Sequence, residues 1–198
     1  MKWYTAVGVK IESTDGAFCV RVGQDTKNLL GVECYVWNTL LWSFVEEAGI
    51  YGRMLRLLRL SFPGRPAKTE IDREEFRLCL RRLLARGLAA CRESGTMEGA
   101  AEAFLQEANV ACVGRTWGER FLTCCESIAD GNTLRDSVQV FQKKPLERAH
   151  GQLLRDIRGS GKAGFSLEKP ETELLQAILG LYKSKLLFIQ SIKEGFVA

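Results

Sequence analysis

The middle of the chain carries a dense cluster of positive charge. Ten arginines and one lysine lie between Arg53 and Arg92, against four acidic residues, so this segment has a charge of +7 in a chain whose formal net charge is +4. The surplus is therefore confined to one segment of the 198 residues. A positive face of this kind predicts a polyanionic partner, of which double-stranded DNA is the commonest.

The same segment has the pattern of helices separated by loops. Apolar residues recur at helical spacing and predict helices over residues 33–48 and 51–60. The run Pro63-Gly64-Arg65-Pro66 predicts a stiff loop after them. Asp72 followed by Glu75 is typical of a capping box, which predicts a third helix over 72–86.

Arginines occupy repeated positions on the second and third of these helices. On the second helix an arginine recurs every three residues, so these arginines share one face. On the third helix an arginine recurs every four residues, and a further arginine follows directly after the last of them. Arginine suits contact with DNA because its planar fork grips guanine edges or phosphates. The candidate DNA-binding residues are Arg53, Arg56, Arg59, Arg73, Arg77, Arg81 and Arg82.

Residues 33–99 resemble the winged helix-turn-helix superfamily of DNA-binding domains. The resemblance rests on the run Leu80-x-x-Leu83-Leu84-x-x-Gly87-Leu88 and on the turn-forming residues Ser94 to Gly99 after it. It implies that helix 72–86 enters the major groove, while the arginines of helix 51–60 bind phosphates. On this basis we expect a DNA-binding regulatory protein of winged-helix type that has no catalytic residues and no cofactor.

Two other interpretations of the arginine-rich segment stay open. The face can be solvated, or it can contact an acidic protein, in which case the chain is a non-catalytic adaptor or peptide-binding module on the same scaffold. The predicted strand over 17–22 is followed by the predicted helix over 33–48. This order of elements also resembles that of the small peptide-recognition domains of ribosomal-peptide maturation enzymes. Those domains bind a leader peptide by adding it to an exposed strand.

The flanking regions complete the expected fold. Residues 3–11 and 17–22, around the turn Thr14-Asp15-Gly16, predict an N-terminal β-hairpin, followed by a polar connection over 23–31. We expect an α+β fold that is mostly α, with a β-hairpin plus winged-helix-like domain over 1–113 and a helical part over 114–198. After Arg86-Gly87, which end the third helix, the later elements expected are strands at 88–91 and 110–113 and helices at 97–108, 117–129, 134–143, 145–158 and 171–194.

The last expected helix has a pattern of alternating three- and four-residue steps. This spacing is typical of a coiled-coil seam and predicts a homodimer interface, with Lys185 as a polar residue within the seam. The alternative is that the helix packs across its own domain. The seam residues are Leu174, Ile178, Leu181, Phe188 and Ile192.

The sequence gives little support to other chemistries. Its seven cysteines contain no C-x-x-C pair and there is one histidine, His150, so we expect structural thiols and no metal site. Gly159-Ser160-Gly161-Lys162 lacks the first glycine and the final hydroxyl of a phosphate-binding loop. There is no apolar run long enough to be a signal peptide or a membrane span, so we expect a cytoplasmic protein.

Overall fold

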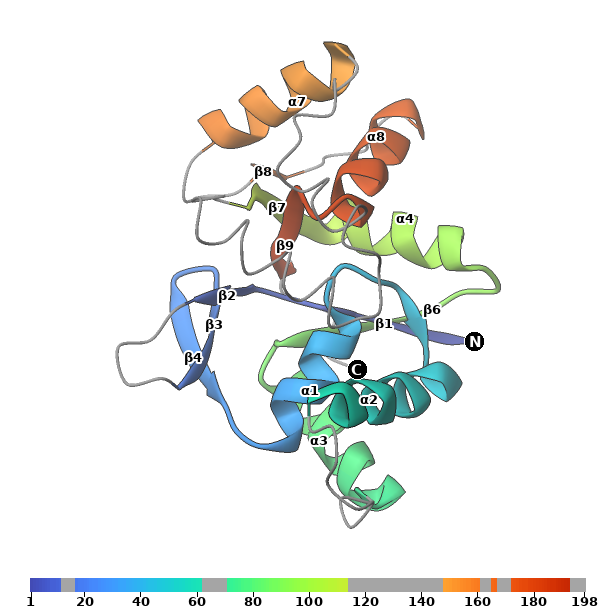
Figure 1. Ribbon diagram of the computed structural model, residues 1–198. Helices are drawn as coiled ribbons and strands as arrows, with labels where there is room; N and C mark the ends of the chain where they lie inside the picture. Colours follow the sequence, from blue (N-terminus) through green and yellow to red (C-terminus); the bar gives the residue numbers. More distant parts are fainter. Residues whose placement is uncertain (12–16, 62–70, 114–147, 161–164, 167–171, 193–198) are drawn as a thin grey trace.

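The computed structural model describes residues 1–11, 17–61, 71–113, 148–160, 165–166 and 172–192. These ranges contain six helices and nine strands (Figure 1). The helices are α1 (Val32–Leu40), α2 (Glu47–Ser61), α3 (Arg73–Ala85), α4 (Met97–Glu107), α7 (Arg148–Gly159) and α8 (Thr172–Lys183). The strands are β1 (Lys2–Ala6), β2 (Val9–Ile11), β3 (Phe18–Val22), β4 (Asp25–Leu29), β5 (Val45–Glu46), β6 (Ala89–Glu93), β7 (Ala108–Cys112), β8 (Phe165–Ser166) and β9 (Leu187–Ile192).

The strands form three antiparallel sheets of three strands each, in the orders β5-β1-β6, β2-β3-β4 and β8-β7-β9. The expectation of a mostly α fold with a winged-helix-like centre and a helical C-terminal part is therefore wrong. The described residues include strands throughout the chain, and the third sheet lies within the part expected to be helical. Most of these strands are two to five residues long, which is too short for a clear alternating pattern.

The winged-helix resemblance implies a wing at residues 94–99, but these residues form the start of a helix. Strand β6 pairs with β1 rather than with a strand that returns from residues 94–99. The Thr96 hydroxyl accepts a hydrogen bond from the Gly99 amide at 3.1 Å, which caps the N-terminus of α4. The turn-forming residues after β6 thus begin a helix, because the Thr96 side chain accepts a hydrogen bond from a backbone amide in the first turn of that helix.

The N-terminal hairpin is confirmed for β2 and β3, but the expected strand 3–11 is divided. Gly8 has a φ of 98°, and a Cβ there would lie 2.6 Å from the Cγ1 of Val20. The chain turns at this glycine, so that β1 enters one sheet and β2 another. The expected connection 23–31 contains strand β4, whose polar sequence gave no strand signal.

Two expected helices end early because the chain adopts a left-handed backbone conformation. Helix 33–48 stops at Leu40, and Trp42 has a φ of 55° before the short strand β5. Helix 171–194 stops at Lys183, and Lys185 has a φ of 59° before β9. The expected helices 51–60, 72–86, 97–108 and 145–158 are confirmed as α2, α3, α4 and α7, and strands 88–91 and 110–113 as β6 and β7. Helices 117–129 and 134–143 lie outside the described residues.

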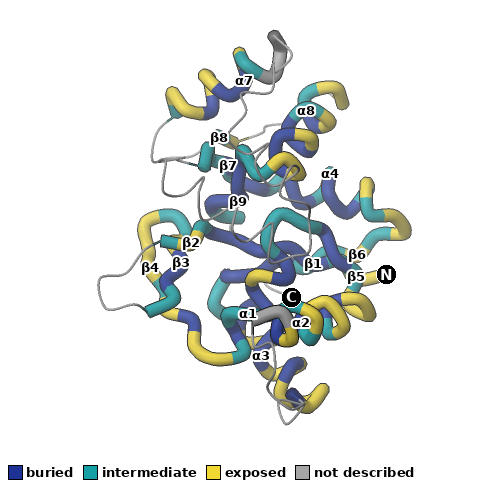
Figure 2. Tube along the Cα trace, in the orientation of Figure 1, coloured by how far each residue is buried: buried dark blue, intermediate teal, exposed yellow. Residues whose placement is uncertain are grey.

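Buried apolar residues form two core clusters that meet at the middle of the molecule (Figure 2). One cluster lies among α1, α2, α3 and the first sheet and includes Trp37 and Leu83. The other lies among α4, α7, α8 and the third sheet and includes Phe104 and Ile178. The Phe44 ring belongs to the second cluster and lies between the rings of Phe104 and Tyr182, with centroids 5.5 and 5.3 Å away.

Polar contacts also join the first part of the chain to the last strand. The Gly8 amide donates to the Ile189 carbonyl at 2.7 Å and the Gly23 amide to the Gln190 carbonyl at 3.0 Å. The expected domain boundary after residue 113 would place β7 in one domain and β9 in the other, although these two strands are neighbours in one sheet. None of the described helices combines the length and the apolar content needed to cross a membrane.

Candidate polyanion-binding site

Helix α2 places its three arginines away from the core. Ile50, Met54 and Leu58 are buried in the first core cluster and define the inner side of the helix. Arg53, Arg56 and Arg59 lie on the outer side, and all three are exposed. The sequence prediction that these residues share one accessible face is therefore confirmed.

Helix α3 has the same division between an apolar inner side and a basic outer side. Phe76, Cys79, Leu80 and Leu83 are buried, and Arg73, Arg77, Arg81 and Arg82 are exposed. Asp72 is the N-cap residue, although its side chain makes no capping hydrogen bond. Because each residue turns the helix by about 100°, Arg82 projects from a different side than the row formed by the other three.

Tyr51 joins the two arginine-bearing helices. Its hydroxyl donates to the Ile71 carbonyl at 2.7 Å, and its ring meets the Phe76 ring edge-on at 5.4 Å. The guanidinium carbon of Arg73 lies 5.5 Å from the centre of the same ring. The start of α3 is thus fixed against the start of α2. We call the seven exposed arginines of α2 and α3 the arginine surface.

The arginine surface has no ion-pair partner within the described part of the chain. The two ion pairs found there join Arg86 to Glu33 and Arg92 to Glu107, and both involve arginines outside the surface. Exposed acids do lie on α3, at Glu74 and Glu75 in its first turn. These two carboxylates moderate the positive potential at that end and form no ion pair with a described arginine.

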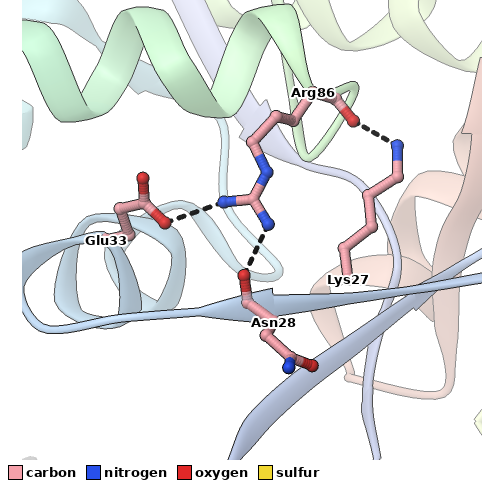
Figure 3. A network of polar contacts seen from close by, with 4 residues as sticks. All are labelled: Lys27, Asn28, Glu33 and Arg86. Carbon is pink, nitrogen blue, oxygen red and sulfur yellow. Dashed lines mark hydrogen bonds and ion pairs between the residues drawn. The ribbon is translucent and has the colours of Figure 1, made fainter.

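Arg86 has a structural role that contrasts with the exposed arginines (Figure 3). Its guanidinium donates to the Glu33 carboxylate at 2.8 Å and to the Asn28 carbonyl at 2.5 Å. The Lys27 ammonium donates to the Arg86 carbonyl at 2.5 Å. These bonds hold the end of α3 to the start of α1 and to strand β4. This network could not be predicted from the sequence, because its members are far apart in the chain.

The expected dimer seam does not exist as one helix face. Leu174, Ile178 and Leu181 lie on α8, whereas Phe188 and Ile192 lie on β9. Ile178, Leu181 and Phe188 are buried within the chain itself, and Leu174 and Ile192 pack against the second core cluster. These residues are therefore used to form the core of the single chain.

Strand β4 and two leucines are surface features that sequence reasoning missed. Strand β4 is the outer strand of its sheet, and Leu30 directly after it is 75% exposed. Leu78 on α3 is 45% exposed between the arginines of that helix. A polar outer strand followed by an exposed leucine is a surface that a peptide can extend.

The described thiols lack the properties of reactive or metal-binding groups. Burial raises the pKa of the Cys34, Cys79, Cys91 and Cys112 thiols, so these groups remain protonated at neutral pH. Within the described ranges no three His, Cys, Asp or Glu side chains come together as metal ligands would. The helix that contains His150 is described, but its side chain is not.

Comparisons with known proteins leave the arginine surface as the main guide to function. They neither support nor refute the resemblance to winged helix-turn-helix proteins. No protein-family model, curated protein or solved structure matches the chain.

Proposed function

We propose that this protein binds double-stranded DNA through the arginine surface of α2 and α3. The observation that supports the proposal is the contrast in pairing: Arg86 and Arg92 hold carboxylates, whereas the seven exposed arginines pair with none of the described acids. Guanidinium groups that pair with none of the described carboxylates are available to phosphates, which they bind through charge-assisted and often paired hydrogen bonds.

The spacing of the arginines fits contact with a nucleic-acid backbone. Arg73, Arg77 and Arg81 recur every four residues, so their attachment points rise by about 6 Å from one to the next. This rise is close to the distance between successive phosphates along a strand, and the α2 arginines add a second row of charge. Leu78, exposed beside this row, is suited to contact a thymine methyl group.

The decisive experiment measures binding to a labelled random duplex by fluorescence anisotropy over a range of salt concentrations. Wild-type protein should show a steep loss of affinity with salt, at a slope of about −0.9 per phosphate contacted. The variant Arg77→Ala/Arg81→Ala should bind much more weakly, with a shallower slope. Arg21 and Arg155 are exposed on β3 and α7, so Arg21→Ala/Arg155→Ala is a control with the same loss of charge. Equal weakening by both variants would mean that only net charge matters and would remove α3 from the site.

A second candidate function is peptide binding by strand addition to β4. It is favoured by the outer position of β4 and by the exposed Leu30. The Asn28 carbonyl accepts from Arg86, which places Asn28 and, by alternation, Thr26 among the residues whose backbone groups face outward. Because Arg86 already occupies the Asn28 carbonyl, Thr26 supplies the groups left for an added strand. Thr26→Pro removes an outward N–H and leaves the bonds to β3 in place, and should therefore abolish binding of such a peptide but not of DNA.

The proposed function is non-catalytic and belongs in the cytoplasm. The five described cysteines, Cys19, Cys34, Cys79, Cys91 and Cys112, are free thiols, which supports a reducing compartment.

A further inference from the structure

The first and third sheets are two copies of one arrangement. In the first sheet, Tyr4 of the central strand β1 pairs with Val45 of β5 and Cys91 of β6. In the third sheet, Val110 of the central strand β7 pairs with Phe165 of β8 and Ile189 of β9. Each sheet thus has a central strand, a two-residue strand on one side, and on the other side a strand that follows a helix.

The helices that precede β6 and β9 end in the same way. After α3, the Gly87 amide donates to the Leu84 carbonyl and the Leu88 amide to the Leu83 carbonyl. After α8, 98 positions later, the Lys185 amide donates to the Tyr182 carbonyl and the Leu186 amide to the Leu181 carbonyl. Gly87 and Lys185 both have positive φ, at 66° and 59°. Helices α3 and α8 are therefore equivalent elements related by a shift of 98 residues.

This equivalence shows where the two helices differ. Leu80 and Leu83 on the inner side of α3 correspond to Ile178 and Leu181 of α8, and all four are buried. On one neighbouring side the match fails: Arg77 and Arg81 are exposed, whereas the corresponding Leu175 and Leu179 are buried. Leu84, on the same side of α3, is half-buried, and its counterpart Tyr182 is fully buried.

Helix α4 contributes to the core cluster in which this side of α8 is buried. Leu175 and Leu179 share a core cluster with Ala101 and Phe104 of α4, and α4 packs against α8 (Figure 1). No described helix covers the corresponding side of α3, where Arg77 and Arg81 meet solvent. We call the surface formed by Arg77, Arg81 and Leu84 the α3 berth. Its counterpart on α8 is buried in a core cluster to which helix α4 contributes, so a helix is the element best suited to this surface.

The residues of the α3 berth define the chemistry of the helix that fits it. Leu84 and the aliphatic stems of the two arginines offer apolar surface, as Tyr182 and the two leucines do in α8. The guanidinium heads, four residues apart, require negative charge at the same spacing on the facing helix. From this geometry we infer that the α3 berth binds an amphipathic helix of a partner protein that carries acidic residues four positions apart.

The inferred contact has a regulatory consequence that rests on the proposed function. Arg77 and Arg81 belong both to the α3 berth and to the arginine surface. A partner helix seated in the berth covers the guanidinium groups that would contact phosphates. The acidic helix and the duplex therefore compete for the protein, and the partner acts as a release factor for DNA.

The experiment uses the full chain and a labelled, designed amphipathic helix of about five turns, with one leucine face flanked by Glu pairs at i, i+4. The matched control peptide has Gln in place of each Glu. Wild-type protein should bind the Glu peptide about tenfold more tightly than the Gln peptide in fluorescence anisotropy. Arg77→Leu/Arg81→Leu, which gives α3 the residues of α8, should lose this preference. Arg53→Leu/Arg56→Leu on α2 should keep it.

A variant with reversed charge, tested with a peptide of reversed charge, distinguishes loss of the contact from misfolding. Arg77→Glu/Arg81→Glu should reject the Glu peptide and bind a Lys version of it, which a protein that merely fails to fold cannot do. Equal binding of the Glu and Gln peptides to wild-type protein, or an unchanged preference after Arg77→Leu/Arg81→Leu, would overturn the inference. Duplex binding is measured separately in the same buffer. Absence of duplex binding overturns the proposed function and the competition with it, but leaves the peptide contact standing. A duplex that binds but does not displace the peptide overturns the competition alone.

Discussion

The Lys185 ammonium lies 5.4 Å from the centre of the Trp42 ring, and both residues have positive φ angles. Trp42 lies just after α1, and Lys185 lies just after α8, so this contact joins two left-handed turns that are far apart in the chain. The Trp42 indole N–H also donates to the Leu187 carbonyl at 3.0 Å. Two strained backbone positions are thus held by contact with each other and with β9.

This contact predicts different stabilities for two substitutions at Lys185. Lys185→Ala removes the cation–π contact and keeps the positive φ on a residue with a Cβ. Lys185→Gly removes the same contact and relieves the strain, as Gly87 does at the equivalent position of α3. The glycine variant should therefore be more stable than the alanine variant by about 1 kcal/mol in urea unfolding. An alanine variant at least as stable as the glycine variant would show that the turn carries no strain.

The buried hydrogen bond between Thr5 and Tyr182 should contribute to the junction of the two core clusters. Their hydroxyl oxygens lie 2.8 Å apart, and neither side chain is accessible to water. Tyr182→Phe should lower the free energy of unfolding by roughly 1–3 kcal/mol, because it leaves the Thr5 hydroxyl buried without this partner. Thr5→Val/Tyr182→Phe should cost less than the sum of the single changes. Strict additivity in this double-mutant cycle would contradict an energetic coupling.

The same tyrosine predicts a loss of stability at alkaline pH. Burial raises the pKa of Tyr182 above its ordinary value near 10, and burial also raises the pKa of Tyr4. The unfolded chain releases these protons as the pH passes about 10, while the folded chain retains them. Stability contributed by the neutral phenols is therefore complete below that pH and falls above it. Unfolding curves between pH 8 and 11 should show a smaller decline for Tyr182→Phe than for wild type.

Arg86 and Arg82 form a matched pair for testing the division between structural and ligand-binding arginines. The Arg86 side chain is 35% exposed and pairs with Glu33, whose side chain is 11% exposed. Arg86→Ala should lower the free energy of unfolding by roughly 1–3 kcal/mol, since a nearly buried carboxylate and the Asn28 carbonyl lose a donor. Arg82→Ala, at an exposed position, should change it by less than about 0.5 kcal/mol. Equal losses of stability in the two variants would show that Arg86 has no structural role beyond that of the exposed Arg82.

The sequence predicted those helix starts and ends that depend on a residue at the start or end itself. Asp72 marked the start of α3, and Gly87 marked the turn into β6, because a glycine is the usual residue at a left-handed helix end. The same turn at Lys185 went unseen, since lysine rarely adopts positive φ. The chain was therefore expected to continue as a helix where it forms β9.

The candidate site was partly predictable for the same reason. The exposure of the seven arginines follows from the periodicity of α2 and α3, because the buried residues of each helix fix its outer side. The pairing of Arg86 with Glu33 did not follow, as 53 positions separate them. The equivalence of α3 and α8 was also hidden, because Arg77 and Arg81 replace the leucines that would have revealed the repeat.

The pairing of β9 with β7 sets the order in which the molecule can be completed during synthesis. The first sheet needs nothing beyond Glu93, so it can assemble while the ribosome is still adding the second half of the chain. The third sheet needs residues up to Ile192, and β9 also supplies the carbonyls that accept from Gly8 and Gly23. A nascent chain therefore keeps the edge of β7 that pairs with β9 open until residues 187–192 have been synthesised.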